Sequence, residues 1–381
     1  MQPLTAAPRD GFTAAQVSAL LVAPDLSVDF GVELLDASLA LVEDIRADVA
    51  GGTVHRDNLA NVHGTCDLTI SRALAWGKDR VRPYQLLTSP SVGISGCRWN
   101  LGVYLLTTPS LPLEQTPPTF AVTGFDQLHL LQNNIGDSYS VAAGANVLIA
   151  VRAVLVAGGI TAPILLDSSG SAKTLATAMV WLQTSSDNPT WILVANALLA
   201  AIGYRGIWCD QDGNFRSSPY VLPADRPSDW RFDVGSLTVG MVAEARSVAN
   251  DVWGVANRWR FIRNNMLTTP IEGAGRYTTD NLATGPSSQT SLGRIVRAPV
   301  VYLDATSQGD LVVQGDRVKA AAMATNEVIT TKLSPFPLAW HSDRVTYADP
   351  ALGVDREALC RSWSLPLDGT DGDYVMETIN V

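Results

Sequence analysis

The stretch that most constrains the fold is residues 191–219, WILVANALLAAIGYRGIWCDQDGNFRSSP, which reads as a helix followed directly by a β-hairpin. Asn188 before Pro189 predicts the start of the helix, since a proline in the first turn loses no helical hydrogen bond. Gly203 can end the helix in a left-handed conformation. Apolar side chains follow helical spacing in between: Trp191, Ala195, Leu198 and Ile202.

The second half of this stretch predicts two strands joined by a tight turn. Residues 204–209 and 214–220 have strand character, and Asp212-Gly213 lies between them. We therefore expect the helix to pack on the sheet that this hairpin begins. The middle of the chain is predicted to be mixed α/β.

Alternating apolar and polar residues predict strands on both sides of that region. The alternation is clear in residues 45–49, 68–76 and 99–105, and again in residues 253–263. In the last segment Trp259 and Phe261 share one face, while Arg258 and Arg260 share the other. Many strands separated by turn residues indicate barrels or sandwiches, in which closure removes aggregation-prone edges.

The remaining segments complete the expected order of elements. Residues 13–22 predict a short helix within an N-terminal arm, and residues 120–131 a strand followed by a helix. The apolar run 147–166 is too broken for a membrane span, because Arg152 and Pro163 interrupt it. We expect a helix of about three turns capped by Asn146. A strand at 164–166 follows this helix. Residues 111–118 form a proline-rich connection, residues 273–289 an exposed excursion, and a helix is expected near 315–325 before the last strands.

Length and composition indicate a folded protein of two or three domains. The chain has 381 residues, of which 46% are hydrophobic and 17% charged, and its formal net charge is −10. An acidic chain has no general attraction for phosphate, which argues against a protein that grips nucleic acid. The same charge suits a wall past which DNA slides.

The residue types that carry chemistry form no recognisable site. The four cysteines, Cys66, Cys97, Cys209 and Cys360, are far apart and indicate free thiols. His55 and His63 fall in adjacent predicted strands and could meet across them, but two histidines do not make a catalytic metal site. The glutamates are scattered, so no carboxylate pair of the kind that glycosidases need stands out. We therefore expect no catalytic residues, no cofactor and no metal.

Two acidic segments and one basic stripe leave alternatives open. Residues 210–214, DQDGN, and residues 368–373, DGTDGD, could bind calcium, but the positions of their glycines favour ordinary turns. Arg258, Arg260 and Arg263 alternate along one strand and could face phosphate or another subunit, although a solvated face is the commoner outcome.

Several sequence words, in order, resemble the tail-hub proteins of tailed bacteriophages. They are GGTVHRD at residues 51–57, RALAWGKDRVRPY at 72–84, WNLGVYLLTTP at 99–109, YSVAAGANVLIAVRAVL at 139–155, and LLAAIGYRGIWCDQDGNFRSSPY at 198–220. The resemblance extends from about residue 28 to residue 227 and is thin beyond that.

The resemblance implies a mainly β chain with two β-barrel domains joined by a mixed helix and strand region. On this basis the N-terminal arm is residues 1–27, the first barrel 28–125, the mixed region 126–203 and the second barrel 204–381, with insertions that include the loop at 273–289. It also implies a homotrimer, whose six barrels form a quasi-sixfold ring.

The resemblance further implies a structural role without enzymatic activity. The ring would join a distal tail protein or tail tube protein to a tip or fibre protein, and the tape-measure protein and then the phage DNA would pass through it. The chain would belong to the tail tip of the virion and be assembled in the cytoplasm of the bacterial host, without insertion into a membrane. Two alternatives remain: a hexameric distal tail protein, and a virion-associated hydrolase of the cell wall.

Overall fold

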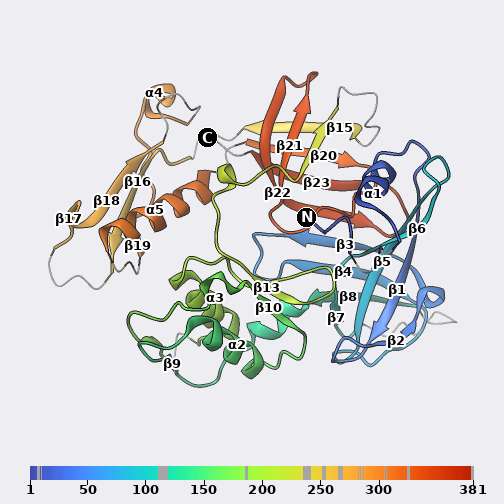
Figure 1. Ribbon diagram of the computed structural model, residues 1–381, viewed down its shortest axis with the longest axis horizontal. Helices are drawn as coiled ribbons and strands as arrows, with labels where there is room; N and C mark the ends of the chain where they lie inside the picture. The colour runs from blue at the N-terminus through green and yellow to red at the C-terminus, as the bar shows by residue number, and fades with distance from the viewer. Residues whose placement is uncertain are drawn as a thin grey trace.

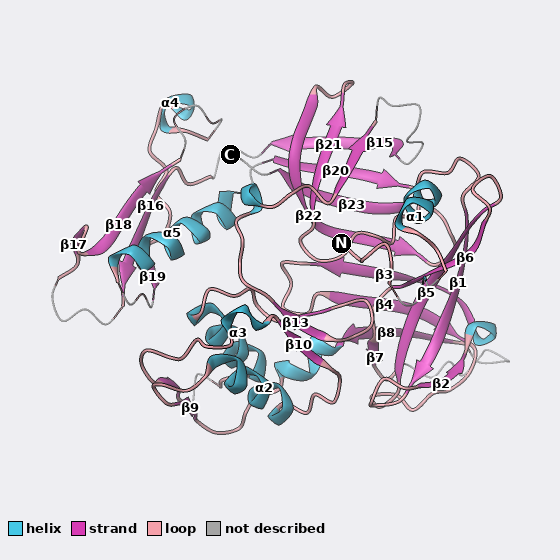
Figure 2. Cartoon of the chain, in the orientation of Figure 1, coloured by secondary structure: helices cyan, strands magenta, loops and turns pink. Residues whose placement is uncertain are grey.

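The protein is mainly β with a mixed α/β region, as the sequence predicts (Figure 2). A computed structural model describes the chain over most of its length. The described residues are 1–6, 9, 11–109, 119–184, 188–234, 242–250, 255–264, 269–281, 283, 285, 287–303, 305, 307–323 and 327–378.

The N-terminal strands form the first strand set, a strongly curled part of the main sheet. In Figure 1 β3 and β4 cross the view while β1 and β5 run steeply to them. Alternating burial along these strands matches the expected period of two, with one face toward the core. The set comprises β1 (Ser27–Leu35), β2 (Leu41–Asp44), β3 (Val49–Asp57), β4 (Gly64–Ile70), β5 (Arg80–Ser89), β6 (Ile94–Asn100), β7 (Tyr104–Leu106) and β8 (Phe120–Asp126).

The second strand set comes from the C-terminal half of the chain. It belongs to the same 14-stranded sheet as the first set, because β22 pairs with β3. We call this pairing the seam. The set comprises β14 (Trp230–Asp233), β15 (Val242–Asn250), β20 (Glu327–Leu333), β21 (Arg344–Asp349), β22 (Val354–Pro366) and β23 (Gly372–Thr378).

Both sets share one hydrophobic core, which runs from Val17 to Met376 in the sequence. The N-terminal segment contributes to it through helix α1 (Ala14–Leu21), which begins with a capping box between Thr13 and Gln16. Val17, Leu20 and Leu21 of this helix are buried in that core. The predicted helix at 13–22 is therefore confirmed, and it packs on the main sheet.

The middle region lies below the main sheet in Figure 1 and has a core of its own. Helices α2 (Val147–Ala157) and α3 (Trp191–Ala201) pack on each other, and Asn146 caps α2 as predicted. The 3₁₀ helix η3 (Gln127–Gln132) leads into this region from β8. Its strands are short: β9 (Tyr139–Val141), β10 (Ile164–Leu166), β11 (Met179–Trp181), β12 (Trp208–Cys209) and β13 (Phe215–Ser217).

Residues 255–323 form the insertion, which separates β15 from β20 and stands apart from the main sheet in Figure 1. A small four-stranded sheet packs on one long helix around Trp259, Phe261 and Leu311. Its elements are β16 (Arg258–Arg263), β17 (Ile271–Glu272), β18 (Gly275–Asp280), β19 (Val301–Leu303), α4 (Gln289–Leu292) and α5 (Gln308–Met323).

Several expected elements differ in detail. The N-cap of α3 is Thr190, whose hydroxyl accepts from the amide of Leu193, and not Asn188. Residues 46–48 form the 3₁₀ turn η2 (Arg46–Asp48) and not a strand, and β4 ends at Ile70 rather than continuing to Trp76. Ile45 and Val49 are buried on either side of η2, although none of its own three residues is. Leu74 and Trp76 pack against the core from outside a strand. Apolar residues at alternating positions therefore overextend the predicted strands.

The predicted loop at residues 273–289 is also wrong. This segment includes strand β18 and the first residue of α4. Its polar sequence favours a strand only weakly, but pairing with β16 gives its backbone the hydrogen bonds of a strand. The predicted strand at 253–263 is observed as β16, while Trp253 and Gly254 lie outside the described residues. The helix expected near 315–325 begins earlier, at Gln308. The proline-rich segment 111–118 also lies outside the described residues.

Candidate functional site: the strand edges and the seam

The two strand sets have the same strand order, although the sequence shows no repeat. In the first set the order is β3–β4–β8–β7–β5–β1, and β6 pairs with β5. In the second set it is β15–β20–β23–β22–β21–β14. The long strand β22 pairs with both β23 and β21, and thus does alone what β7 and β6 do together. The one reversal is that β14 runs parallel to β21, whereas β1 runs antiparallel to β5.

The register of the central pair is also the same in both sets. Strands β4 and β20 each have seven residues, as do β8 and β23. Ile70 at the end of β4 lies opposite Phe120 at the start of β8, and Leu333 at the end of β20 lies opposite Gly372 at the start of β23. Two separate parts of the chain therefore build the same ladder with matching ends.

The equivalent edges of the two sets differ in what covers them. The outer edge of β3 is paired with residues 362–366 of β22. Its counterpart β15 pairs with β20 on one side, and its other edge has no partner strand among the described residues. An unpaired strand edge presents a row of backbone donors and acceptors that can pair with another chain. The edge of β15 is thus a candidate assembly site.

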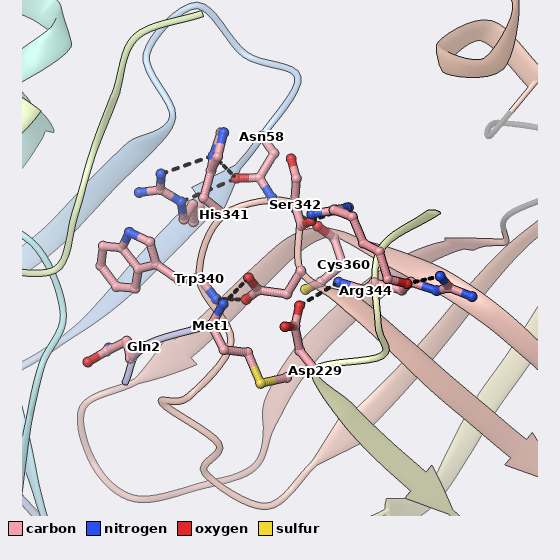
Figure 3. A network of polar contacts seen from close by, with 12 residues as sticks. Met1, Gln2, Asn58, Asp229, Trp340, His341, Ser342, Arg344 and Cys360 are labelled. Carbon is pink, nitrogen blue, oxygen red and sulfur yellow. Dashed lines mark hydrogen bonds and ion pairs between the residues drawn. The ribbon is translucent and has the colours of Figure 1, made fainter. Parts of the chain in front are cut away.

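A buried polar network closes the seam beside the turn from β3 to β4 (Figure 3). The side-chain oxygen of Asn58 accepts from the Nε of Arg56 at 3.2 Å and lies 3.0 Å from the Nδ1 of His341. The Asn58 amide nitrogen donates to the carbonyl of Cys360 at 2.8 Å. The Nη2 of Arg56 lies 3.4 Å from the same nitrogen of His341. The network therefore ties the turn of the first set to two segments of the second.

Arg56 is the buried charge of this network. Its side chain lies 4.7 Å over the ring of Trp340, and its Nη2 donates to the carbonyl of Cys209 at 3.4 Å. Burial lowers the pKa of Arg56 and raises the pKa of nearby Asp126 to about 6, although the positive charge of Arg56 counteracts the second shift. A cation on an aromatic face that also donates to two oxygen atoms, those of Asn58 and Cys209, is better stabilised than an isolated buried charge.

His341 connects three parts of the molecule through ring contacts. Trp208 of the middle region stacks on it at 4.8 Å, and His63 of the first set lies 5.0 Å from it. Burial, reinforced by the charge of Arg56, lowers the pKa of His63 to about 3 and depresses the pKa of His341 as well. The sequence suggested that His63 could meet His55; it meets His341 instead, because β4 pairs Thr65 with His55.

On the other side of the network, an ion pair joins the amino group of Met1 to the Asp343 carboxylate, and Asp343 also accepts from the backbone amide of Trp340 (Figure 3). Nearby, Asp229 accepts from the backbone amide of Arg344 at 3.0 Å. These contacts fix the loop between β20 and β21 against the N-terminal segment and against the residues before β14.

The turn at residues 210–214 joins the middle region to the first strand set. Asp210 accepts from the amides of Asp212 and Asn214, so the predicted turn is confirmed. Asn100 donates to the Asp212 carboxylate at 2.6 Å, and the carbonyl of Gly213 accepts from Gln127 at 2.7 Å. The carboxylates of this turn thus serve local contacts. The same holds for Asp368, which accepts from Thr370.

The sequence contains few candidate catalytic or metal-binding residues, and the structure places few of them close to one another. All four cysteines are buried free thiols. Across the described ranges, no three His, Cys, Asp or Glu side chains lie close enough to share a metal ion. None of the described helices has the length and apolarity needed to cross a bilayer. What the sequence did not reveal is the seam, since its partners lie about 300 residues apart.

Several solved structures share this fold over almost the whole chain. A tail protein from Neisseria meningitidis MC58 matches with a TM-score of 0.63 at 11% identity, covering 92% of this chain and 96% of that one. The 43 kDa tail protein of prophage MuSo2 from Shewanella oneidensis matches with a TM-score of 0.60 at 11% identity, covering 91% and 98%. Prophage tail protein gp18 from Listeria monocytogenes EGD-e matches with a TM-score of 0.52 at 9% identity, covering 91% and 94%.

Neither a protein-family profile nor a curated protein sequence matches the chain. The structural matches define the class: this chain has the fold of bacteriophage tail proteins. The resemblance to tail-hub proteins seen in the sequence is therefore confirmed at the level of the fold.

Proposed function

We propose that this chain is a structural subunit of a phage tail tip. Three copies would form a quasi-sixfold hub ring that joins the tail tube or distal tail protein to the tip or fibre. The tape-measure protein and then the DNA would pass through the ring, past an acidic wall that does not hold them. The subunit would be assembled in the host cytoplasm and then belong to the virion tail.

One observation carries this proposal: two strand sets of the same order have equivalent edges, one paired within the chain and one left open by the strands that the structure describes. If the open edge of β15 takes a strand from a neighbouring copy, the contact is heterologous. Heterologous contacts either close into a ring or grow into a filament. Two equivalent sets in each of three copies give six similar positions around such a ring.

The oligomeric state of the purified protein tests the proposal. We expect a trimer by native mass spectrometry and by light scattering at micromolar concentration. Because backbone amides alternate in direction along a strand, Ser247→Pro and Val248→Pro remove an amide from opposite edges of β15. One variant should lose the outward donor and the trimer while keeping its melting temperature, and the other should lose a bond to β20 and unfold more readily. A wild-type chain that stays monomeric, or a trimer that both folded variants retain, contradicts the ring.

We also propose that the chain has no catalytic role. A cell-wall degradation assay with purified trimer tests this directly, since measurable activity that one Glu substitution abolishes would show a hydrolase.

A further inference from the structure

The insertion differs from the rest of the chain in charge. Residues 255–323 contain eight Arg and Lys and five Asp and Glu residues, a net charge of +3. The rest of the chain contains nineteen basic and thirty-two acidic residues, a net charge of −13. The basic insertion is therefore attracted to acidic protein surfaces, including the acidic surface of another copy of this chain.

The two faces of the insertion sheet are unlike. Helix α5 covers one face, where Phe261 is fully buried and the Tyr277 hydroxyl donates to Asp316 at 2.7 Å. The period of two places Arg258, Arg260 and Ile262 of β16 on the opposite face. Register across the sheet adds further residues to that face: Arg276 and Thr278 of β18 and Tyr302 of β19.

Arg260 lies at the centre of this face without a bound carboxylate. Arg258 pairs with Asp280, and Arg276 pairs with Glu272. The Arg260 guanidinium is exposed and has no hydrogen bond or ion pair within the described residues. Apolar surface adjoins it, because Tyr302 is 61% exposed and Val300 is 42% exposed. The outer edge of β19 has no partner strand in the part of the chain that the structure describes.

The opposite end of the molecule carries the complementary features. All four residues of β2 are exposed, and Leu41 and Val42 are each more than half exposed. Residues 36–48 contain four acidic residues and one arginine. Strand β2 pairs only with β1 among the described strands, so its outer edge is open as well. Figure 1 shows β2 and the insertion at opposite ends of the long axis, so one chain does not bring them together.

We propose that the uncovered face of the insertion, with Arg260, Val300 and Tyr302, binds the β2 end of a neighbouring copy of this chain. The inference rests on the proposed ring. The insertion follows β15 in the chain, so in the proposed ring a neighbour at the open edge of β15 also lies near the insertion. Opposite charges and exposed apolar side chains on both surfaces then add a second heterologous contact to the strand pairing.

Cysteine cross-linking tests this contact, and the chain offers a clean background because its own four cysteines are buried. The variant that combines Val42→Cys with Tyr302→Cys would be treated with a short bifunctional thiol reagent and separated under denaturing conditions. We expect covalent dimers and trimers from this variant. Each single-cysteine variant should give dimers at most, because a heterologous contact joins unlike sites. An equal mixture of the two single variants should give mixed dimers.

Charge reversal supplies the matched control. Arg260→Glu should lower the cross-linking yield roughly tenfold, since it turns an attraction into a repulsion at an exposed site. Arg152→Glu reverses an exposed arginine on α2, away from the proposed contact, and should leave the yield unchanged.

Three outcomes would overturn the inference. A trimeric solution in which the double-cysteine variant gives no covalent trimer contradicts the contact while leaving the ring intact. A protein that is monomeric before the reagent is added contradicts the ring itself, so the two failures are distinguishable. An oligonucleotide-binding activity that Arg260→Glu abolishes, with cross-linking unchanged, would show that the face binds nucleic acid.

Discussion

The two strand sets use one ladder in two different ways. In the first set the edge strand β3 is paired, and a short turn leads from it to β4, with Asn58 and His63 half-buried against the second set. In the second set the equivalent strand β15 has an edge that no described strand covers, and the equivalent connection is the insertion. The same topology thus supplies stability where its edge is covered within the chain, and in the ring that we propose the uncovered edge serves assembly.

The largest expected effect comes from opening the covered edge. Trp363 lies opposite Arg56 in the seam, is buried, and packs at 5.7 Å on Trp340. Trp363→Ala should lower the free energy of unfolding by about 3–5 kcal/mol, because a large side chain is removed from a packed core. Chemical denaturation measures this loss. Leu352→Ala, at a partly exposed position, is the control, and a similar small change in both variants would show that the seam contributes little.

The insertion should respond independently of the seam. A Cβ at Gly315 would lie 2.6 Å from the ring of Phe261, whereas one at Gly309 on the same helix would meet only the Ser307 hydroxyl at 3.9 Å. Gly315→Ala should destabilise the insertion by about 1–3 kcal/mol through overpacking. Gly309→Ala should stabilise α5 by about 0.5 kcal/mol through helix propensity.

Hydrogen exchange of the α5 and β22 amides separates the two regions. We expect faster exchange in α5 alone for Gly315→Ala. Equal loss of protection in β22 would mean that the insertion and the main sheet unfold as one unit.

Acid should weaken the seam through His63. Its folded pKa of about 3 is below the ordinary value of 6.5, so the unfolded chain takes up a proton that the folded chain does not. Stability from this residue is therefore lost as the pH falls from 6.5 toward 3, by about 1.4 kcal/mol for each pH unit. His63→Phe keeps a ring against His341 and removes a buried nitrogen that has no partner.

Denaturation curves at pH 6.5 and pH 5.5 should show that His63→Phe is less sensitive to acid than the wild type by about 1 kcal/mol. His55→Phe, at an exposed position on β3, is the matched control. Equal acid sensitivity in the wild type and His63→Phe would refute the role of His63.

The smallest effect is expected on the surface of the insertion. Arg258 and Asp280 form a two-pronged ion pair at 2.7 and 2.8 Å, but both side chains are about one-third or more exposed. Arg258→Gln should lower the stability of the insertion only slightly at low salt, and the difference should shrink as salt screens the pair. A larger, salt-independent loss would indicate that Arg258 supports packing.

Much of the local structure was predictable because it depends on neighbours in sequence. The cap and spacing of α2, the turn at Asp210 and the two faces of β16 follow from side chains within a few residues of each other. The N-cap of α3 was misplaced by two positions, since Thr190 and Asn188 are both good caps and only the fold selects between them. The strand β18 was missed because its sequence is polar and pairing alone stabilises it.

By itself, then, the sequence determined most of the helices and strands, which of their faces are buried, and that the body is acidic. The tertiary structure alone decided that two unlike segments build the same ladder, that β3 pairs with β22, and that His63 meets His341. A period of two tells which face of a strand is buried but not which strand lies beside it. Strands β3 and β22 are about 300 residues apart in the chain, and they lie side by side because both pack on the same hydrophobic core.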